Sequence, residues 1–202
     1  PQGHSGGTPV RNVSKVIETV APAAEDCGRA ERPDLNCDFQ IVVDDTPGEG
    51  PNAFQTLDDN GRPVIAFTIP LIAVARNIDE LAFIMAHEAA HHIAGHIPRQ
   101  RQSALAGARL LGGIAAVVSG GREDSIKAGV ELGAKIGART YSKAFELEAD
   151  ALGTRIAARA GYDPVRGAAF FLRIPDPGDE FLGSHPANGD RLSTIRAVAS
   201  QL

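Results

Sequence analysis

The sequence predicts an α+β fold, with a small sheet near the N-terminus and a mostly helical second half. Apolar and polar residues alternate over residues 38–43, which is typical of a strand. Two further strand-like runs, at residues 53–57 and 64–69, flank an Asn-Gly dipeptide, a signal for an antiparallel hairpin. From Pro70 onward the apolar residues recur at helical spacing.

The composition indicates a globular chain and excludes several classes of protein. The 202 residues are 43% hydrophobic, which is enough for a core and too high for a disordered chain. The net charge of −5 argues against nucleic acid as a partner, because phosphate binding requires a basic face. Charged residues interrupt every apolar run before it reaches the roughly 20 residues of a membrane span.

The chain is expected to hold one domain behind a short lead. Residues 1–12 are expected to form a flexible N-terminal lead, because the chain opens on a segment rich in Gly, Pro and Ser. Residues 13–202 then form a single domain of ordinary size, which begins with a short amphipathic helix over residues 14–24. Residues 99–141 are rich in Gly and Ala, and we expect closely packed small-residue helices or a mobile lid there.

Two cysteines, Cys27 and Cys37, flank a segment whose Gly, Pro and Asn residues predict a tight loop. A disulfide between them would stabilise the fold by about 2–3 kcal/mol and would indicate an oxidising compartment, such as the periplasm or the outside of the cell. Two buried free thiols are the alternative. A metal site is disfavoured, because no second cysteine pair or nearby histidine completes a ligand set.

Capping and stop signals outline the later helices. A short helix is expected over residues 70–77. Asn77 and Glu80 resemble a capping box at the start of the next helix, which is expected to stop at Pro98. The remaining helices are expected from Ser142 to just before Gly161, from Asp163 as N-cap to residue 174, and over residues 190–202.

The most informative feature is His87-Glu88-Ala-Ala-His91, an HExxH motif on the helix that follows the sheet. Residues four apart lie on one face of a helix, so both imidazoles can reach one ion. Zinc suits two neutral imidazoles and a carboxylate, with the fourth position left for water, from which Glu88 can take a proton as general base. A surface helix with ordinary histidines is the alternative, and the apolar residues around the motif argue against it.

The third ligand has to come from another part of the chain. His96 is a candidate, but the HExxHxxGxxH motif requires glycine at position 94 and histidine at position 97. On a helix that continues past His91, His96 is expected to point away from the site. His92 points roughly 100° away from the ligand face. Both are therefore interpreted as structural or surface residues.

A downstream helix offers three carboxylates. At about 100° per residue, Glu146 and Asp150 share a face of small apolar residues that includes Gly153. Glu148 lies on the opposite, charged stripe, where it can pair with Arg155. A carboxylate that faces inward among alanines has to be paired or metal-bound, so we expect Glu146 to be the metal ligand and Asp150 to accept a hydrogen bond from a ligand imidazole. Gly153 would let two helices approach closely. A buried carboxylate pair with Arg partners is the alternative.

HExxH followed by ExxxD resembles the Ste24/HtpX/CAAX-prenyl-protease family of gluzincin zinc metallopeptidases, in its soluble, periplasmic-type branch. The likeness covers roughly residues 50–200. Further segments of this chain also resemble the family. Before and within the HExxH helix they are Asn52-Ala53-Phe54 ahead of the hairpin, DELA ahead of HExxH, and a histidine at the position of His96. After it they are Tyr141-Ser142 ahead of Glu146-Leu-Glu-Ala-Asp150, GYDP at residues 161–164, and His185-Pro186 followed by Arg191. The membrane helices of the Ste24 and HtpX branches are missing, and QTLDDNGRP stands where the family has a turn rich in Pro and Gly.

The resemblance implies a zincin-like fold, in which a small sheet with an edge hairpin packs on the HExxH helix. It implies an endopeptidase with one zinc ion at His87, His91 and Glu146 and with Glu88 as general base. An extended or unfolded polypeptide would bind by strand addition to one edge of the hairpin. Relatives without membrane spans resemble periplasmic proteases that handle damaged or misassembled envelope proteins, which agrees with a periplasmic or secreted location.

His185 precedes a proline in the loop before the last helix, and three roles are open for it. As a catalytic residue it would hydrogen-bond the tetrahedral intermediate. It would alternatively occupy the fourth zinc position in a resting state, as the family's HP histidine is able to do. The third role is that of a loop histidine buried against Asp190 or Arg191.

Two other functions stand beside proteolysis. A chaperone-like binding module with latent or lost proteolysis would keep the same zinc ligands. A purely structural zinc site is disfavoured, because three protein ligands leave a position open, whereas structural sites use four.

Overall fold

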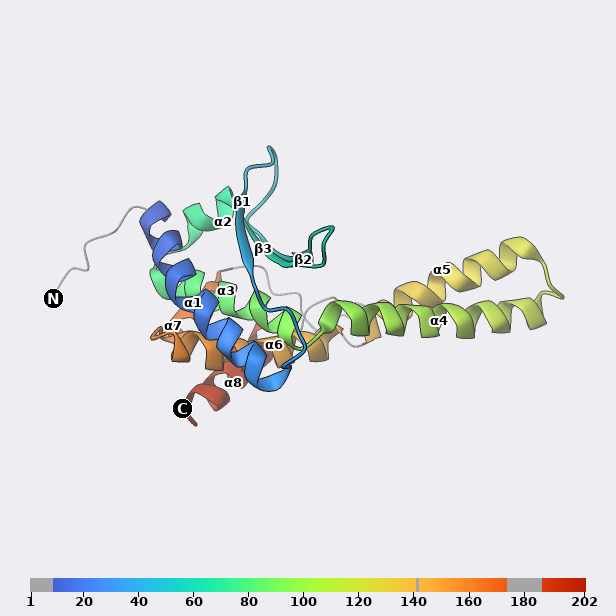
Figure 1. Cartoon of the computed structure of the whole chain (residues 1–202). Helices are drawn as coiled ribbons and strands as arrows, with labels where there is room; N and C mark the ends of the chain where they lie inside the picture. The colour runs from blue at the N-terminus through green and yellow to red at the C-terminus, as the bar shows by residue number, and fades with distance from the viewer. Residues whose placement is uncertain (1–8, 141, 174–186) are drawn as a thin grey trace.

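The computed structural model describes residues 9–140, 142–173 and 187–202. A small sheet lies on one side of a body of helices, and one pair of long helices projects from that body (Figure 1). The elements are, in chain order, α1 (Pro9–Glu31), β1 (Gln40–Asp44), β2 (Ala53–Leu57), β3 (Pro63–Thr68), α2 (Ile69–Val74), α3 (Ile78–Ile93), α4 (His96–Val118), α5 (Glu123–Thr140), α6 (Ser142–Arg159), α7 (Pro164–Ala168), the 3-10 helix η1 (Ala169–Leu172) and α8 (Asn188–Ala199).

The three strands form a mixed sheet in the order β1-β3-β2. β1 runs parallel to β3, with Gln40 opposite Val64, and β2 runs antiparallel to β3, with Phe54 opposite Ala66. The hairpin predicted around the Asn-Gly dipeptide is therefore confirmed. Its second strand is buried along most of its length and forms the centre of the sheet. This sheet and the helices around it confirm the α+β class.

α1 extends further in both directions than the short helix expected over residues 14–24. It begins at Pro9, so the end of the expected lead, residues 1–12, already belongs to the helix, and the earlier part of that lead lies outside the described residues. The apolar face of α1, on which Val16 and Val20 are buried, packs against α3.

Cys27 and Cys37 are free thiols, so the expected disulfide is wrong. The sulfur of Cys37 packs so closely on Gly28 of α1 that a Cβ on this glycine would lie 2.3 Å from it. Cys27 is one position earlier on the helix and therefore projects about 100° away. Burial raises the pKa of both thiols. The cysteines give no support for an oxidising compartment.

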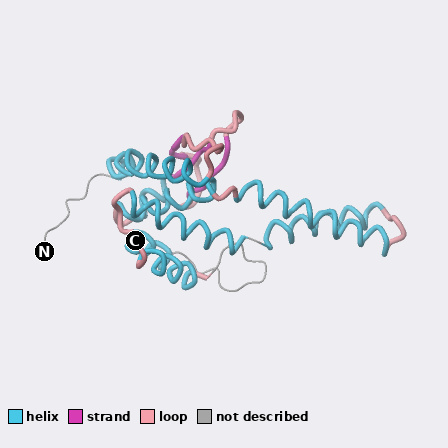
Figure 2. Tube along the Cα trace, turned by 60° about the horizontal axis from the view of Figure 1, so that its bottom comes forward, coloured by secondary structure: helices cyan, strands magenta, loops and turns pink. Residues whose placement is uncertain are grey.

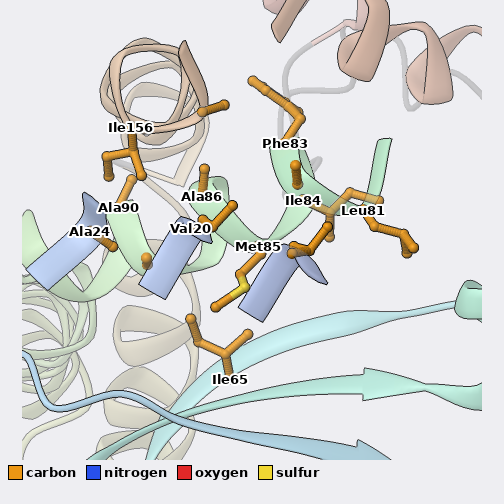
Figure 3. Packing of buried hydrophobic residues seen from close by; sticks show 14 of the residues in the cluster. Val20, Ala24, Ile65, Leu81, Phe83, Ile84, Met85, Ala86, Ala90 and Ile156 are labelled. Atoms are coloured by element: carbon orange, nitrogen blue, oxygen red, sulfur yellow. The ribbon is translucent and has the colours of Figure 1, made fainter. Parts of the chain in front are cut away.

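α3 passes through the centre of the body and is buried on nearly all sides. α1, α6, α7 and the sheet pack around it. Figure 3 shows side chains of α3 beside Val20 of α1, Ile65 of β3 and Ile156 of α6. Its largest fully buried side chains are Phe83, Met85 and Ile93. As predicted, Asn77 caps its first turn, where Oδ1 accepts a hydrogen bond from the backbone N–H of Glu80 at 3.1 Å. The HExxH motif therefore stands on a helix most of whose residues are buried.

α3 ends earlier than expected. Its last residue is Ile93, and Gly95 adopts a left-handed conformation with φ of 68° before α4 begins at His96. Pro98 does not end a helix. It lies in the first turn of α4, where a backbone N–H has no carbonyl partner within the helix, so proline is tolerated there.

α4 and α5 form an antiparallel pair that projects away from the body in both views (Figures 1 and 2). Glycines allow their backbones to touch: a Cβ on Gly133 would lie 2.1 Å from the carbonyl oxygen of Gly107. These are the closely packed small-residue helices expected in residues 99–141, and action as a lid stays a prediction. Within the described residues, no helix combines the length and the apolar character needed to cross a membrane.

α6 packs along α3 and carries the candidate carboxylates Glu146 and Asp150. A Cβ on Gly153 would lie 3.0 Å from the backbone of His87, so this glycine permits the close approach that the sequence predicts. The chain turns at Gly161, with φ of 88°, and Asp163 caps α7 as expected. α8 packs against α6, and residues 174–186 before it lie outside the described residues.

Candidate metal centre

Two helices bring three potential metal ligands together. α3 supplies His87 and His91, one turn apart on one face, and α6 supplies Glu146. One ligand atom from each side chain lies within 4.8 Å of the other two. The structure thus joins the HExxH motif to the carboxylate that the helical periodicity of the sequence selects.

The distances between these atoms suit a tetrahedral ion. Nε2 of His91 lies 3.0 Å from Nε2 of His87 and 3.3 Å from Oε1 of Glu146. Nε2 of His87 lies 3.5 Å from Oε2 of Glu146. Nitrogen and oxygen ligands about 2.0–2.1 Å from a tetrahedral zinc ion are about 3.3 Å from one another. The donor set and its spacing therefore fit one zinc ion bound by these three described side chains.

Asp150 supports His87 from the side opposite the ligand cluster. Its Oδ1 lies 2.9 Å from Nδ1 of His87, and Arg191 donates hydrogen bonds to both carboxylate oxygens at 2.7 and 2.8 Å. Burial by itself would raise the pKa of Asp150, but the hydrogen bonds from Arg191 and His87 hold that pKa below its ordinary value. With Nδ1 of His87 engaged in this way, its Nε2 faces Glu146.

Arg191 enters the sequence analysis only as part of the segment that begins with His185-Pro186, and its contact with Asp150 and Glu146 comes from the structure. Its Nη2 lies 3.7 Å from Oε2 of Glu146, and its guanidinium lies 3.7 Å from the centre of the Phe171 ring. The signal that could have revealed it is its place on the apolar face of α8 beside Leu192 and Ile195, which are both buried. A charged group on such a face requires a buried partner of opposite charge.

His96 lies beside His91, and the expectation that it points away is wrong. Nδ1 of His96 is 2.8 Å from Nδ1 of His91, because α3 ends before it and Gly95 turns the chain back. Burial and, to a smaller extent, the nearby charge of His91 lower the pKa of His96 to about 4, so the imidazole is neutral at pH 7. His92 faces elsewhere, as expected, with Nε2 2.7 Å from the carbonyl oxygen of Asn36.

Glu148 completes the surroundings of His96. Its Oε2 lies 3.2 Å from Nε2 of His96 and 2.8 Å from Nη1 of Arg99. The expected pair of Glu148 with Arg155 is therefore wrong, and Arg155 faces Glu31 instead, at 4.0 Å. The cause is the early start of α4, which brings Arg99 over α6 in a way that the charge pattern of α6 alone does not reveal.

Glu88 lines the same cleft as the three candidate ligands. Burial raises its pKa, and the nearby imidazoles of His87 and His91 partly oppose that rise. A carboxylate with a raised pKa is better suited to accept a proton and to pass it on at neutral pH.

The candidate ligands open into a cleft of about 580 Å³, which β2 lines on one side. The N–H of Thr68 donates to the carbonyl oxygen of Asn52 at 3.0 Å, so these two residues form a bonded pair. Bonded and non-bonded pairs alternate in an antiparallel ladder, so the backbone groups of Ala53 and Gln55 point away from β3. Both residues line the cleft, and no described strand pairs with that edge of β2.

Residues 10–199 match peptidase family M48. The chain belongs to this family. The match confirms the resemblance found in the sequence, and it confirms the class of metalloprotease. M48 metallopeptidases depend on zinc, with which the His-His-Glu cluster is consistent. His185, the remaining candidate site residue, lies outside the described residues.

Several relatives are named for a role in β-barrel assembly. The chain is 30% identical to the beta-barrel assembly-enhancing protease of Yersinia pestis over 138 residues, which is 62% of this chain and 28% of that protein. It is 29% identical to the protein of the same name from Escherichia coli K12 over 65% of this chain and 30% of that protein. A putative beta-barrel assembly-enhancing protease of Vibrio cholerae is 30% identical over 82% of this chain and 38% of its own length. The chain therefore spans roughly a third of these M48 relatives.

Proposed function

We propose that this chain is a zinc-dependent endopeptidase of zincin-like fold that hydrolyses peptide bonds in unfolded or misassembled proteins. The observation that carries the proposal is the cluster of His87, His91 and Glu146 at zinc spacing, in a cleft that also holds Glu88 and the open edge of a strand. Membership of family M48 supports the same chemistry.

In the proposed mechanism each residue has a distinct task. His87, His91 and Glu146 would hold zinc, which when bound supplies a Lewis acid for the scissile carbonyl and lowers the pKa of a water molecule. Glu88 accepts the proton of the attacking water and delivers it to the leaving amine. Asp150 keeps a proton on Nδ1 of His87, which leaves the lone pair of Nε2 free. His185 stays a candidate for stabilising the oxyanion.

The open edge of β2 supports binding of the substrate as an added strand. Ala53 and Gln55 offer unpaired backbone N–H and C=O groups within the cleft, and an extended peptide can satisfy both kinds at once. Main-chain recognition of this kind requires an unfolded segment and places little demand on its side chains.

The names of the relatives point to a substrate class and a location. A β-barrel closes only when its strands have paired, so an unfinished barrel protein exposes free strand edges. Such a segment is the kind that β2 could pair with. On this ground we propose that the substrates include barrel proteins that have not completed assembly, and that the protein acts in the periplasm or is secreted.

The test is cleavage of casein, an unfolded protein, by the zinc-loaded chain and by Glu88→Gln. We expect cleavage by the first and a loss of about 10²–10⁴-fold in rate for the second, with equal zinc content in both, because Gln occupies the same space and cannot act as a base. Equal rates for the two would contradict the role of Glu88.

The same assay addresses the chaperone-like alternative. A zinc-loaded chain that leaves casein intact but prevents an unfolding protein from aggregating would be a binding module, and the endopeptidase proposal would then be wrong.

A further inference from the structure

His96 is a buried polar residue next to the candidate metal centre that the proposed mechanism leaves unused. We propose that His96 is a positioning residue, which fixes the tautomer and orientation of His91, and that Glu148 fixes those of His96 in turn. The inference rests on the proposed zinc site. It concerns how this chain presents one of the ligands.

The chain of hydrogen bonds defines where the protons lie. A carboxylate accepts hydrogen bonds and does not donate them, so Nε2 of His96 carries the proton that faces Glu148 at 3.2 Å. Nδ1 of His96 lies 2.8 Å from Nδ1 of His91, and two ring nitrogens at this distance share one proton. Because the proposed zinc site needs the lone pair of Nε2 of His91, that proton belongs on Nδ1 of His91, and Nδ1 of His96 accepts it. With its proton held there, His91 presents the lone pair of Nε2 toward His87 and Glu146, which is the form that a metal ligand needs.

Packing holds His96 in this position. Its side chain is only 5% exposed, and its ring stacks on Phe145 with centroids 4.5 Å apart and planes at 9°. The guanidinium of Arg99 lies 4.3 Å from the centroid of the same Phe145 ring and also donates to Glu148. The stacked ring and the carboxylate therefore fix His96 both in place and in rotation.

The two candidate histidine ligands are thus supported by different groups. Nδ1 of His87 meets the carboxylate of Asp150 directly, whereas Nδ1 of His91 meets a second imidazole, with the carboxylate of Glu148 one ring further out. Loss of His96 should therefore weaken the hold of His91 on zinc and leave the support of His87 intact.

Three variants separate the hydrogen bond from the packing. His96→Phe keeps an aromatic ring that can stack on Phe145 but offers no acceptor to His91. His96→Asn places an amide oxygen near the position of Nδ1 and can restore that acceptor. His92→Phe is the matched control, since His92 bonds the backbone of Asn36 and touches no candidate ligand.

The readouts are zinc affinity, measured by competition with a chromogenic chelator, and the visible absorption spectrum of the Co²⁺-loaded protein. We expect His96→Phe to weaken zinc binding about 10–100-fold and to alter the Co²⁺ bands, His96→Asn to recover most of the affinity, and His92→Phe to stay within about threefold of the unaltered chain. Equal affinity and identical spectra for His96→Phe and the unaltered chain would overturn the inference.

Glu148→Ala provides the same test from the surface in case His96→Phe fails to fold by circular dichroism. The Glu148 side chain is 46% exposed, so its removal is compatible with folding. We expect a smaller loss of zinc affinity in the same direction, and no loss would overturn the role given to Glu148 and His96. Failure of the unaltered chain to bind zinc would overturn the zinc site and this inference with it, whereas a chain that binds zinc but cleaves nothing would contradict only the proposed function.

Discussion

At the scale of single residues, the candidate metal centre depends on buried charges that compensate one another. Asp150 has no exposed surface and Arg191 is 5% exposed, and the two hydrogen bonds between them satisfy both charges. Taking ionised groups out of water costs several kcal/mol each unless they are paired with good geometry. The same pair touches His87, so loss of either partner disturbs a candidate ligand as well.

Arg191→Met tests this dependence. We expect it to lower the free energy of unfolding of the metal-free protein by about 3–5 kcal/mol, because it removes the guanidinium that donates two hydrogen bonds to the buried carboxylate of Asp150. The double variant Arg191→Met with Asp150→Asn should lose less than the sum of the two single changes. Urea denaturation of the four proteins measures both quantities.

Arg159→Met is the control for this cycle. Arg159 is 61% exposed and lies 3.9 Å from Asp26, so its removal should change stability by less than about 1 kcal/mol. An Arg191→Met variant as stable as Arg159→Met would contradict the account of the buried pair.

At the scale of elements, close backbone contact defines the α4–α5 pair. Gly133 and Gly107 face each other at a distance that leaves no room for a side chain on either. Gly113 lies on the same pair of helices, and a Cβ there would meet nothing within 4 Å. Alanine substitutions at Gly133 and Gly113 therefore distinguish the effect of helix packing from the effect of helix propensity.

Gly133→Ala and Gly113→Ala should have opposite effects. We expect Gly113→Ala to stabilise the helix by about 0.5–1 kcal/mol, since alanine loses less backbone entropy. Gly133→Ala should destabilise the pair by about 1–3 kcal/mol through overpacking and speed amide hydrogen exchange in α4 and α5. Hydrogen exchange with mass spectrometry resolves this region, and slower exchange in Gly133→Ala would contradict the packing described above.

A second element, β2, is tested through its backbone. Gln55→Pro removes one outward N–H without removing a bond to β3, and proline is tolerated on an edge strand. Gln55→Ala removes the same side chain and keeps the N–H. We expect kcat/KM for casein to be about 2–10-fold lower for Gln55→Pro than for Gln55→Ala. This ratio corresponds to the net free energy of one hydrogen bond. Equal kcat/KM for the two, at equal thermal stability, would count against strand addition at this edge.

At the scale of the whole molecule, the candidate ligands connect two helices that are far apart in the sequence. His87 and His91 belong to α3 and Glu146 to α6, so an ion bound by all three would link them. A ligand that binds only the folded state stabilises it by about 2.7 kcal/mol at a hundred times its dissociation constant. Zinc should therefore raise the melting temperature, and Glu146→Gln should lose most of that rise.

The effect of zinc should also depend on pH. Burial by itself lowers the pKa of His87, but the carboxylates of Asp150 and Glu146 outweigh it and raise that pKa to about 10 in the metal-free protein. The pairing of protonated His87 stabilises the metal-free fold fully below pH 6.5 and is lost as the pH rises through about 10. Zinc must displace this proton, so its apparent affinity should rise about tenfold per pH unit from pH 6 to pH 8. Calorimetric titration at both pH values measures this, and an affinity independent of pH would contradict it.

The sequence by itself determined several of the elements and the helix face that carries the candidate ligands. Local patterns were sufficient for the β2–β3 hairpin and for the caps at Asn77 and Asp163, because turns and caps depend on neighbouring residues. Helical periodicity was sufficient to place Glu146, and not Glu148, on the face that meets His87 and His91, since an angle around one helix does not depend on the rest of the fold. The role of Glu146 as a metal ligand stays a prediction.

Only the tertiary structure decided how those faces meet. The left-handed turn at Gly95 places His96 next to His91. Helical periodicity assumes a continuous helix and therefore predicted that His96 points away from His91. Arg191, the partner of Asp150, lies on a helix far away in the chain. The contact of the Cys37 sulfur with Gly28 depends on packing that no local pattern reveals. Spacing along one helix is a property of the sequence, whereas contact across two helices depends on where each one ends and how closely glycine lets them approach.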